Sequence, residues 1–413
     1  MQNSSLINRF NDSRVGWIQP KEKVYGIMVS LIVIFKLIGD VTPYPNQIFV
    51  GYIGLTLFVG LYFFPFRKSE FRQVSRSIFI SLLYVFTFIL VSYYGVSWEY
   101  SVSHNALLLP LYLIHFLIFY IFALRVTPST GLFYVYRAML VYGLLAVLFS
   151  QIGLIDAEKT RVISGVDIPL GVCLAFLFGD LFSLFLFLVI ALMSIKKTVI
   201  LASFLALFLT FTFSRFFKAG NLDLPIQKIR KIQFSKSVIA VLGLFCAIFL
   251  VGLFFPFFSA SIARLGETGI DYYRVLAALE FARLLAEYFP QGTGFYTFGF
   301  LTIETIEYTS STASGEVLPD GMSLHNTPFH ILLEGGLIVS LCWITNIIRL
   351  VYGSRLMLKT KLFKPIGVLL LVWFIITNIY GLTQQLHSSH YFFGLFGLFY
   401  GYFDKYKALM QPQ

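Results

Sequence analysis

The chain has 413 residues, of which 58% are hydrophobic and only 12% are charged, and its mean hydropathy is +0.80. In soluble proteins, about a quarter of the residues are charged. This composition therefore excludes an ordinary soluble enzyme and predicts an all-α polytopic membrane protein. The formal net charge is +11, yet the segment 259–324 holds eight acidic residues and three arginines. This asymmetry follows the positive-inside rule and disfavours a nucleic acid as partner.

Apolar runs of membrane-spanning length recur along the whole chain. About 20 consecutive apolar residues cross a bilayer as a helix. By this rule the sequence predicts spans at 24–41, 48–66, 77–96, 106–124, 132–154, 168–194, 198–214, 236–258, 328–352, 366–383 and 390–403. We therefore expect about 11 to 12 transmembrane helices.

The distribution of Lys and Arg orients these spans. The basic segment 1–23 lacks the apolar core of a cleaved signal and is expected in the cytoplasm. The acidic residues then belong to one large external (periplasmic) loop, 259–327, with a helix expected over 270–288. This loop separates N-terminal transmembrane helices, 1–258, from C-terminal transmembrane helices, 328–413.

The orientation is inconsistent in the middle of the chain. A single crossing at 198–214 puts Arg215 outside, whereas the residues from 218 to 236 include five Lys and Arg, which is typical of an inner loop. We expect a break near 214–215, after which the chain turns back into the membrane through a short helix. Such breaks are tolerated at membrane depth where protein surrounds them.

The start of the span at 328–352 carries the strongest candidate for chemistry. Asn326 is a good N-cap and Pro328 suits the first turn of a helix, whose free N–H groups attract phosphates. His325 precedes this cap, and His330 and Glu334 share one face below it. Ionisable groups at a membrane helix favour a functional role. The alternative is that they only cap the helix and bond within the bundle.

Two arginines and two glycines could complete an anion site. Arg215 closes an apolar run and Arg274 lies in the acidic segment; both are suited to grip a pyrophosphate, although each could instead be an interfacial anchor. Gly292 and Gly294 could let backbone approach a phosphate, but this spacing alone is a weak signal.

Other polar residues have simpler interpretations. Asp180 lies inside an apolar run, where it could belong to a site or bind a neighbouring helix; we favour the second. His387 and His390 could face the same cavity, but no third ligand at a fixed spacing indicates a metal. The three cysteines lie in apolar runs and give neither a disulfide framework nor a zinc pattern.

One resemblance joins these residues. His325-Asn326, followed by Glu334 and Gly336, resembles the His-Asn(Ser)…Gly signature of the O-antigen ligase and O-antigen polymerase family of bacterial envelope glycosyltransferases. Two further pieces are similar to that family: the residues 212–215 at the end of an apolar run, and Arg274 followed by Pro290-x-Gly292-x-Gly294.

The resemblance implies transfer of a preassembled glycan from undecaprenyl pyrophosphate to an acceptor hydroxyl at the periplasmic face of the bacterial inner membrane. No cofactor or metal is implied. The acceptor is a lipid-linked repeat unit in a polymerase, which a chain-length regulator could assist, or lipid A–core in a ligase. The implied roles are general base for His325, pyrophosphate binding for Arg215, Arg274 and Asn326, and support of the site for His330, Glu334, Gly336, Gly292 and Gly294.

Two alternatives to a polymerase stay open. A ligase would recognise a heavily phosphorylated core acceptor, and the acidic external loop disfavours this. A transporter or flippase would use Lys36, Asp180 and Glu334 as an intramembrane relay, but it predicts inverted repeats, which the sequence does not display.

Overall fold

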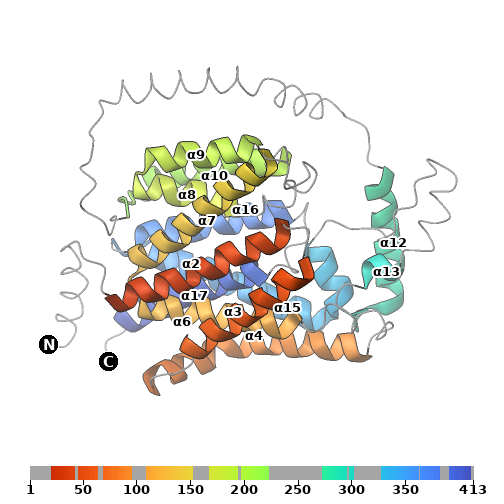
Figure 1. The fold of residues 1–413 in the computed structure, drawn as a ribbon. Coiled ribbons are helices and arrows are strands. Elements are labelled where there is room, and N and C mark those ends of the chain that lie inside the picture. Colours follow the sequence, from red (N-terminus) through yellow and green to blue (C-terminus); the bar gives the residue numbers. More distant parts are fainter. Residues whose placement is uncertain are drawn as a thin grey trace. The chain divides into compact units, whose positions relative to one another are not determined.

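The computed structural model of the protein consists of helices and the turns between them (Figure 1). It describes residues 20–41, 45–63, 68–94, 108–151, 167–193, 197–222, 272–294, 297–301, 327–361, 363–381 and 390–410. No strand occurs within these ranges. The all-helical class predicted from the sequence is confirmed for this part of the chain.

The helices form two compact units that interleave in sequence. The first unit contains α2 (Pro20–Val41), α7 (Pro128–Gln151), α8 (Asp167–Phe178), α9 (Leu181–Met193) and α10 (Lys197–Phe216). The second contains α4 (Lys68–Tyr94), α6 (Leu108–Arg125), α12 (Tyr272–Tyr288), α13 (Phe298–Leu301), α15 (Thr327–Met357), α16 (Lys364–Gly381) and most of α17 (His390–Met410). The helix α3 (Pro45–Phe63) is divided between them. The division into N-terminal transmembrane helices 1–258, an external loop 259–327 and C-terminal transmembrane helices 328–413 stays a prediction.

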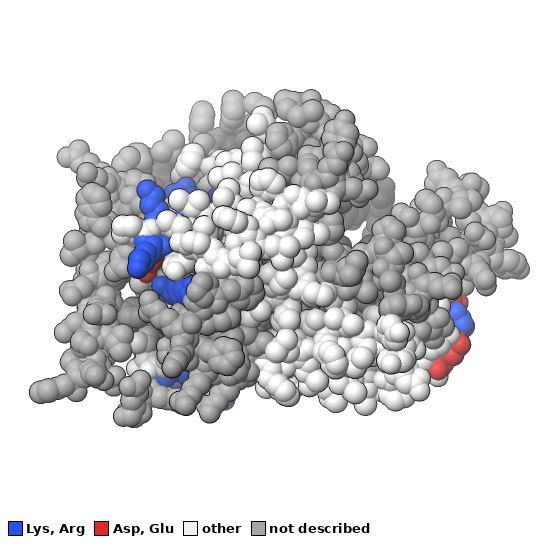
Figure 2. All heavy atoms as spheres, turned by 60° about the horizontal axis from the view of Figure 1, so that its bottom comes forward, with Lys and Arg blue, Asp and Glu red and all other residues white. Residues whose placement is uncertain are grey.

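Among the described residues, three helices are long and apolar enough to cross a membrane: Pro128–Leu148, Val199–Phe216 and Thr327–Met357. Several outward side chains on other helices are large and apolar, such as Leu61, which is 72% exposed, and Phe79, which is 63% exposed. Most of the described surface in Figure 2 is uncharged. A surface of this kind fits a lipid environment, and the protein is a membrane protein.

In the first unit, α2 and α7 run in the same direction. The backbone N–H of Thr127, just before α7, donates to Glu22 in the first turn of α2. One turn further along, Gly26 lies against the ring of Tyr134, where a Cβ would come within 2.2 Å of it. The two helices therefore begin at the same end of the unit.

The predicted span 168–194 is wrong as a single helix. The chain turns at Gly179, whose φ of +66° suits a residue without Cβ. The N–H groups of Gly179 and Asp180 bond back to Phe176 and Ala175, which closes α8. Antiparallel α9 then packs on α8, so that Gly171 lies against the ring of Phe187. The apolar run is a helical hairpin because a glycine with positive φ interrupts it.

The break expected near 214–215 is confirmed in position. The helix α10 ends at Phe216, and the N–H of Ala219 bonds to the carbonyl of Ser214. The N–H of Leu222 then reaches the carbonyl of Leu177 in α8. The chain thus turns back beside the tip of the hairpin, while the short helix expected after the break lies outside the described residues.

In the second unit, α15 lies between α4 and α16 and is not one straight helix. Gly336 has φ +68° and ψ −166°, which breaks α15 into a first segment, 327–335, and a second segment, 337–357. The first segment folds back on the second, since the hydroxyl of Ser340 donates to the carbonyl of Ile331 over 3.4 Å. Asp404 in α17 joins the second segment of α15 to α6, because it accepts hydrogen bonds from Arg349 and from Tyr120.

Candidate functional site

The loop 290–294 closes the break in α15. Breaking a helix at Gly336 takes the usual N–H partners away from the carbonyls of the preceding turn. Thr293 donates its N–H to the carbonyl of Leu333, and Gly294 donates to that of Glu334, each over 2.9 Å. In return, the N–H of Leu337 donates to the carbonyl of Pro290 over 2.9 Å. The loop and the helix therefore provide hydrogen-bond partners for each other's backbone N–H and carbonyl groups.

Two glycines allow this contact. Gly292 has φ +91° and Gly336 has φ +68°. A Cβ on Gly292 would lie 2.7 Å from the backbone nitrogen of Gly336, and a Cβ on Gly336 would lie 2.4 Å from the carbonyl oxygen of Gln291. Such distances are far below a normal carbon contact. Close approach of backbone to backbone is therefore what these two glycines provide.

A buried, hydrogen-bonded pair of side chains lies next to the break. The Nδ1 of His330 is 3.0 Å from Oε1 of Glu334, and the two side chains are only 4% and 1% exposed. The same carboxylate oxygen accepts the backbone N–H of Phe298, at the start of α13, over 3.4 Å. The edge of the Phe298 ring also faces the imidazole. Glu334 thus fastens the first segment of α15 to α13.

Buried threonines were missed by the sequence analysis. Thr293 and Thr297 are fully buried, and the hydroxyl of Thr297 bonds to the hydroxyl of Thr293 and to the carbonyl of Gly294. Thr293 is the middle residue of the Gly-x-Gly pattern and Thr297 follows it four residues later, and this spacing was the available signal. Their hydroxyls hold the loop in the shape that reaches α15.

Apolar contacts join α12 to the same place. Phe281 stacks on Phe329 with ring centroids 4.5 Å apart, and Leu284 packs with Leu333 in one buried cluster. The opposite face of α12 carries an exposed chain of charges, in which Arg283 bridges to Glu280 and Glu287. The helix expected over 270–288 is therefore amphipathic, and its apolar face covers the first segment of α15.

The structure brings together five of the residues predicted for the site. These are Gly292, Gly294, His330, Glu334 and Gly336. Their roles in catalysis stay predictions.

The remaining predicted residues are not joined to this cluster by the described structure. His325 and Asn326, like His387, lie outside the described residues. Arg274 is in the first turn of α12, but its side chain is outside the part that the structure describes. Arg215 belongs to the other unit, where its guanidinium lies 4.5 Å from the centre of the Phe211 ring.

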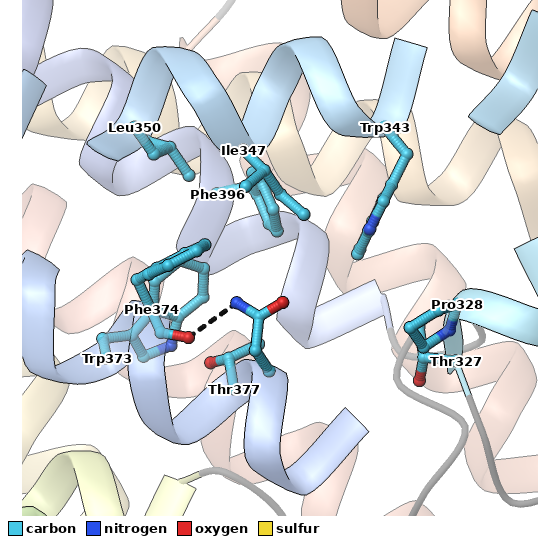
Figure 3. A pocket seen from close by; sticks show the side chains of 10 residues that line it. Thr327, Pro328, Trp343, Ile347, Leu350, Trp373, Phe374, Thr377 and Phe396 are labelled. Atoms are coloured by element: carbon cyan, nitrogen blue, oxygen red, sulfur yellow. Dashed lines mark hydrogen bonds between the residues drawn. The ribbon is translucent and has the colours of Figure 1, made fainter. Parts of the chain in front are cut away.

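A small aromatic pocket begins at the first residues of α15 (Figure 3). Thr327 and Pro328 form one end of it, immediately after the predicted His325-Asn326 pair. Its walls come from the second segment of α15, from α16 and from α17, and its lining also includes Trp343, Ile347, Leu350, Trp373, Phe374, Thr377, Asn378 and Phe396. The buried hydroxyl of Thr377 has no hydrogen-bond partner in this lining. Such a pocket can hold an apolar or stacking group and offers few polar contacts.

The expectation that Asp180 binds a neighbouring helix is confirmed. Its carboxylate accepts hydrogen bonds from Tyr136 and Arg137 of α7 and from the backbone and hydroxyl of Ser183. The bond from the Ser183 N–H makes Asp180 the N-cap of α9. All of these partners are structural, which weakens the idea of a proton relay at Asp180.

Comparison with known proteins adds no family assignment. No protein-family model matches the chain, and no curated protein matches it. Among the described residues, no group of three His, Cys, Asp or Glu side chains could hold a metal ion.

Proposed function

We propose that the protein is a multi-pass glycosyltransferase of a bacterial inner membrane. It transfers a preassembled glycan from undecaprenyl pyrophosphate to an acceptor hydroxyl at the periplasmic face, and it acts as a polymerase of O-antigen or a related surface polysaccharide. The acceptor is then a second lipid-linked repeat unit.

One observation carries this proposal. The two sequence pieces that resemble the O-antigen ligase and polymerase family, Pro290-x-Gly292-x-Gly294 and Glu334-x-Gly336, are some forty residues apart but lie in direct backbone contact. Residues that form a signature for a functional reason are expected to meet in space. Chance matches to a short pattern carry no such expectation.

The contact supports a division of roles. Arg274 and the backbone N–H groups after Asn326 bind the pyrophosphate, which gains negative charge as it leaves. His325 takes the proton from the acceptor hydroxyl. The oxygen of that hydroxyl then bonds to the anomeric carbon of the glycan, while the bond between this carbon and the pyrophosphate breaks. The buried His330–Glu334 pair, one turn along the same helix, is a positioning element that holds the first segment of α15 in place.

The choice of polymerase over ligase rests on charge. The segment 259–324 holds eight acidic residues and three arginines, so it would repel a core acceptor that carries many phosphates. A lipid-linked repeat unit meets less repulsion, because its phosphates lie at the membrane surface.

Deletion of the gene, followed by gel analysis of lipopolysaccharide, tests the proposal. Loss of the ladder with one repeat unit still on the core is expected for a polymerase. Loss of every attached O-chain identifies a ligase instead. An unchanged ladder contradicts both assignments.

Complementation with variants tests the residues. His325→Ala and Arg274→Ala should restore no ladder, although both variants reach the membrane in normal amounts. Glu287→Ala, an exposed change on α12, is the matched control and should restore it fully.

A further inference from the structure

The hairpin of α8 and α9 is too short for either arm to cross a bilayer. The arms have 12 and 13 residues, or about 18–20 Å at the helical rise, against a hydrocarbon core of about 30 Å. Ile168 near the start of α8 and Ile190 near the end of α9 both touch Gly143 of α7. The hairpin therefore returns the chain to the level at which it entered.

The tip of the hairpin is fixed beside α7. Arg137, which pairs with Asp180 over 3.1 Å, lies about two and a half turns after Pro128, the start of α7. Phe178 packs on Phe133 in the same region. An ionised pair inside an apolar bundle requires this kind of mutual contact. The hairpin thus enters from the end of the unit where α7 finishes and stops short of the end where α7 begins.

The helix α10 runs parallel to α8 and extends past the tip. The thiol of Cys173 contacts the carbonyl of Ala206, and Phe176 packs on Phe211, one turn before Arg215. Because α8 is antiparallel to α7, the carboxyl end of α10 lies at the end of the unit where α2 and α7 begin (Figure 1).

The charges of the sequence orient that end. Basic residues lie in the segment before α2 and in the first turn of α2. The chain after α10 also carries five Lys and Arg residues in the stretch 218–236. Basic loops stay in the cytoplasm. We propose that the α8–α9 hairpin is re-entrant from the periplasmic side, and that α10 crosses toward the cytoplasm, so that Arg215 and the basic stretch after it face the cytoplasm.

This topology removes the inconsistency found in the sequence. With the hairpin no longer counted as a crossing, α10 delivers the chain to the inside, and the predicted span 236–258 returns it to the outside before the acidic loop. The expected 11 to 12 crossings become ten, with the hairpin in addition. Lys196 and Lys197 become exceptions to the positive-inside rule. A crossing at 168–194 would instead place the five Lys and Arg residues of the stretch 218–236 outside, so the number of exceptions falls from five to two.

The inference changes the predicted site. Arg215 and the acidic loop then lie on opposite sides of the membrane, so Arg215 takes no part in binding the pyrophosphate. Arg274 and the start of α15 keep their proposed roles. The topology does not depend on the glycosyltransferase activity, and the two proposals can fail separately.

Labelling of single cysteines with a membrane-impermeant maleimide tests the topology. The background is the full chain with Cys173, Cys246 and Cys342 replaced by alanine. Ser194→Cys lies between α9 and α10, and Gly220→Cys follows α10 at a position where a Cβ meets nothing within 4 Å. Ser311→Cys and Ser13→Cys mark the two sides.

Ser194→Cys should react in intact spheroplasts, as Ser311→Cys does, and Gly220→Cys should react only after permeabilisation, as Ser13→Cys does. A single crossing at 168–194 gives the reverse pattern. The same test with Lys196→Cys and Ala219→Cys serves if either first variant fails to reach the membrane. Any pattern other than the expected one overturns the proposal, and a single monodisperse peak of the cysteine-free background in size-exclusion chromatography in detergent confirms that the labelled protein is folded.

Discussion

The backbones of Gly292 and Gly336 are in direct contact, so that a Cβ on Gly292 would lie only 2.7 Å from the backbone nitrogen of Gly336. Both residues also have a positive φ. Gly336→Ala should destabilise the protein by about 2 kcal/mol or more, because a left-handed conformation alone costs about 1–2 kcal/mol and the backbone clash adds to it. Heating in detergent, followed by size-exclusion chromatography, measures the loss. Gly220→Ala is the control with open space around it and should behave as the wild type.

Substitution of Glu334 tests its role as a buried hydrogen-bond acceptor. Glu334→Ala removes the acceptor for the His330 imidazole and for the Phe298 N–H, and a buried donor without a partner costs about 1–3 kcal/mol. Glu334→Gln keeps an oxygen at this place and should lose clearly less stability. Glu287→Ala on the exposed face of α12 should stay within about 0.5 kcal/mol of the wild type. Equal stability of the Ala and Gln variants would contradict the role given to this carboxylate.

The packing of the hairpin predicts a rescue. Gly171→Ala places a methyl group 2.3 Å from the ring of Phe187, and overpacking of this kind costs about 1–3 kcal/mol. Phe187→Leu should recover much of that loss in the double variant, even though it weakens the hairpin alone. A double-mutant cycle from thermal unfolding measures this coupling. Additive effects would mean that α8 and α9 do not pack face to face.

Asp180 distinguishes the transferase from a transporter. Asn is as good an N-cap as Asp, so Asp180→Asn should keep the hairpin and leave the lipopolysaccharide ladder unchanged. Asp180→Ala also removes the cap and should lower stability by about 0.5–2 kcal/mol. A carrier that moves protons or ions through this carboxylate would be inactivated by Asp180→Asn, and that outcome would favour the rival function.

The two arginines should respond in opposite ways. Under the proposed topology, Arg215→Ala leaves the ladder intact, because its guanidinium is on the cytoplasmic side, whereas Arg274→Ala abolishes it. The measurement is complementation of the deletion strain with equal amounts of each variant in the membrane. If Arg215→Ala also removes the ladder while its membrane level is normal, Arg215 belongs to the site and the hairpin topology is wrong.

Helix positions follow closely from local apolar length. The run 106–124 corresponds to α6, Leu108–Arg125, and the run 366–383 to α16, Lys364–Gly381. Burial of an unbroken apolar stretch decides such elements, and nothing distant is needed. The helix expected over 270–288 also agrees with α12, Tyr272–Tyr288.

The turns within apolar runs could not be predicted in the same way. Long apolar runs continue on both sides of Gly179 and Asp180, so the mean hydropathy stays high across the turn. The packing of α9 against α8 is what makes this stretch a hairpin. The break at Gly336 likewise depends on a loop some forty residues earlier in the chain, which supplies the missing hydrogen bonds. The pairing of His330 with Glu334 was visible because both are on one helix, whereas the bond from Phe298 was not.

The clasp between the loop 290–294 and α15 also sets a rule for engineering the protein. Surface loops are usually the parts of a protein that can be shortened or exchanged most freely. Here an exchange that removes Pro290–Gly294 would leave the carbonyls of Leu333 and Glu334 without their N–H donors. A chimera that receives a foreign loop must therefore keep these five residues, because they supply the hydrogen bonds that hold the first segment of α15 at its break.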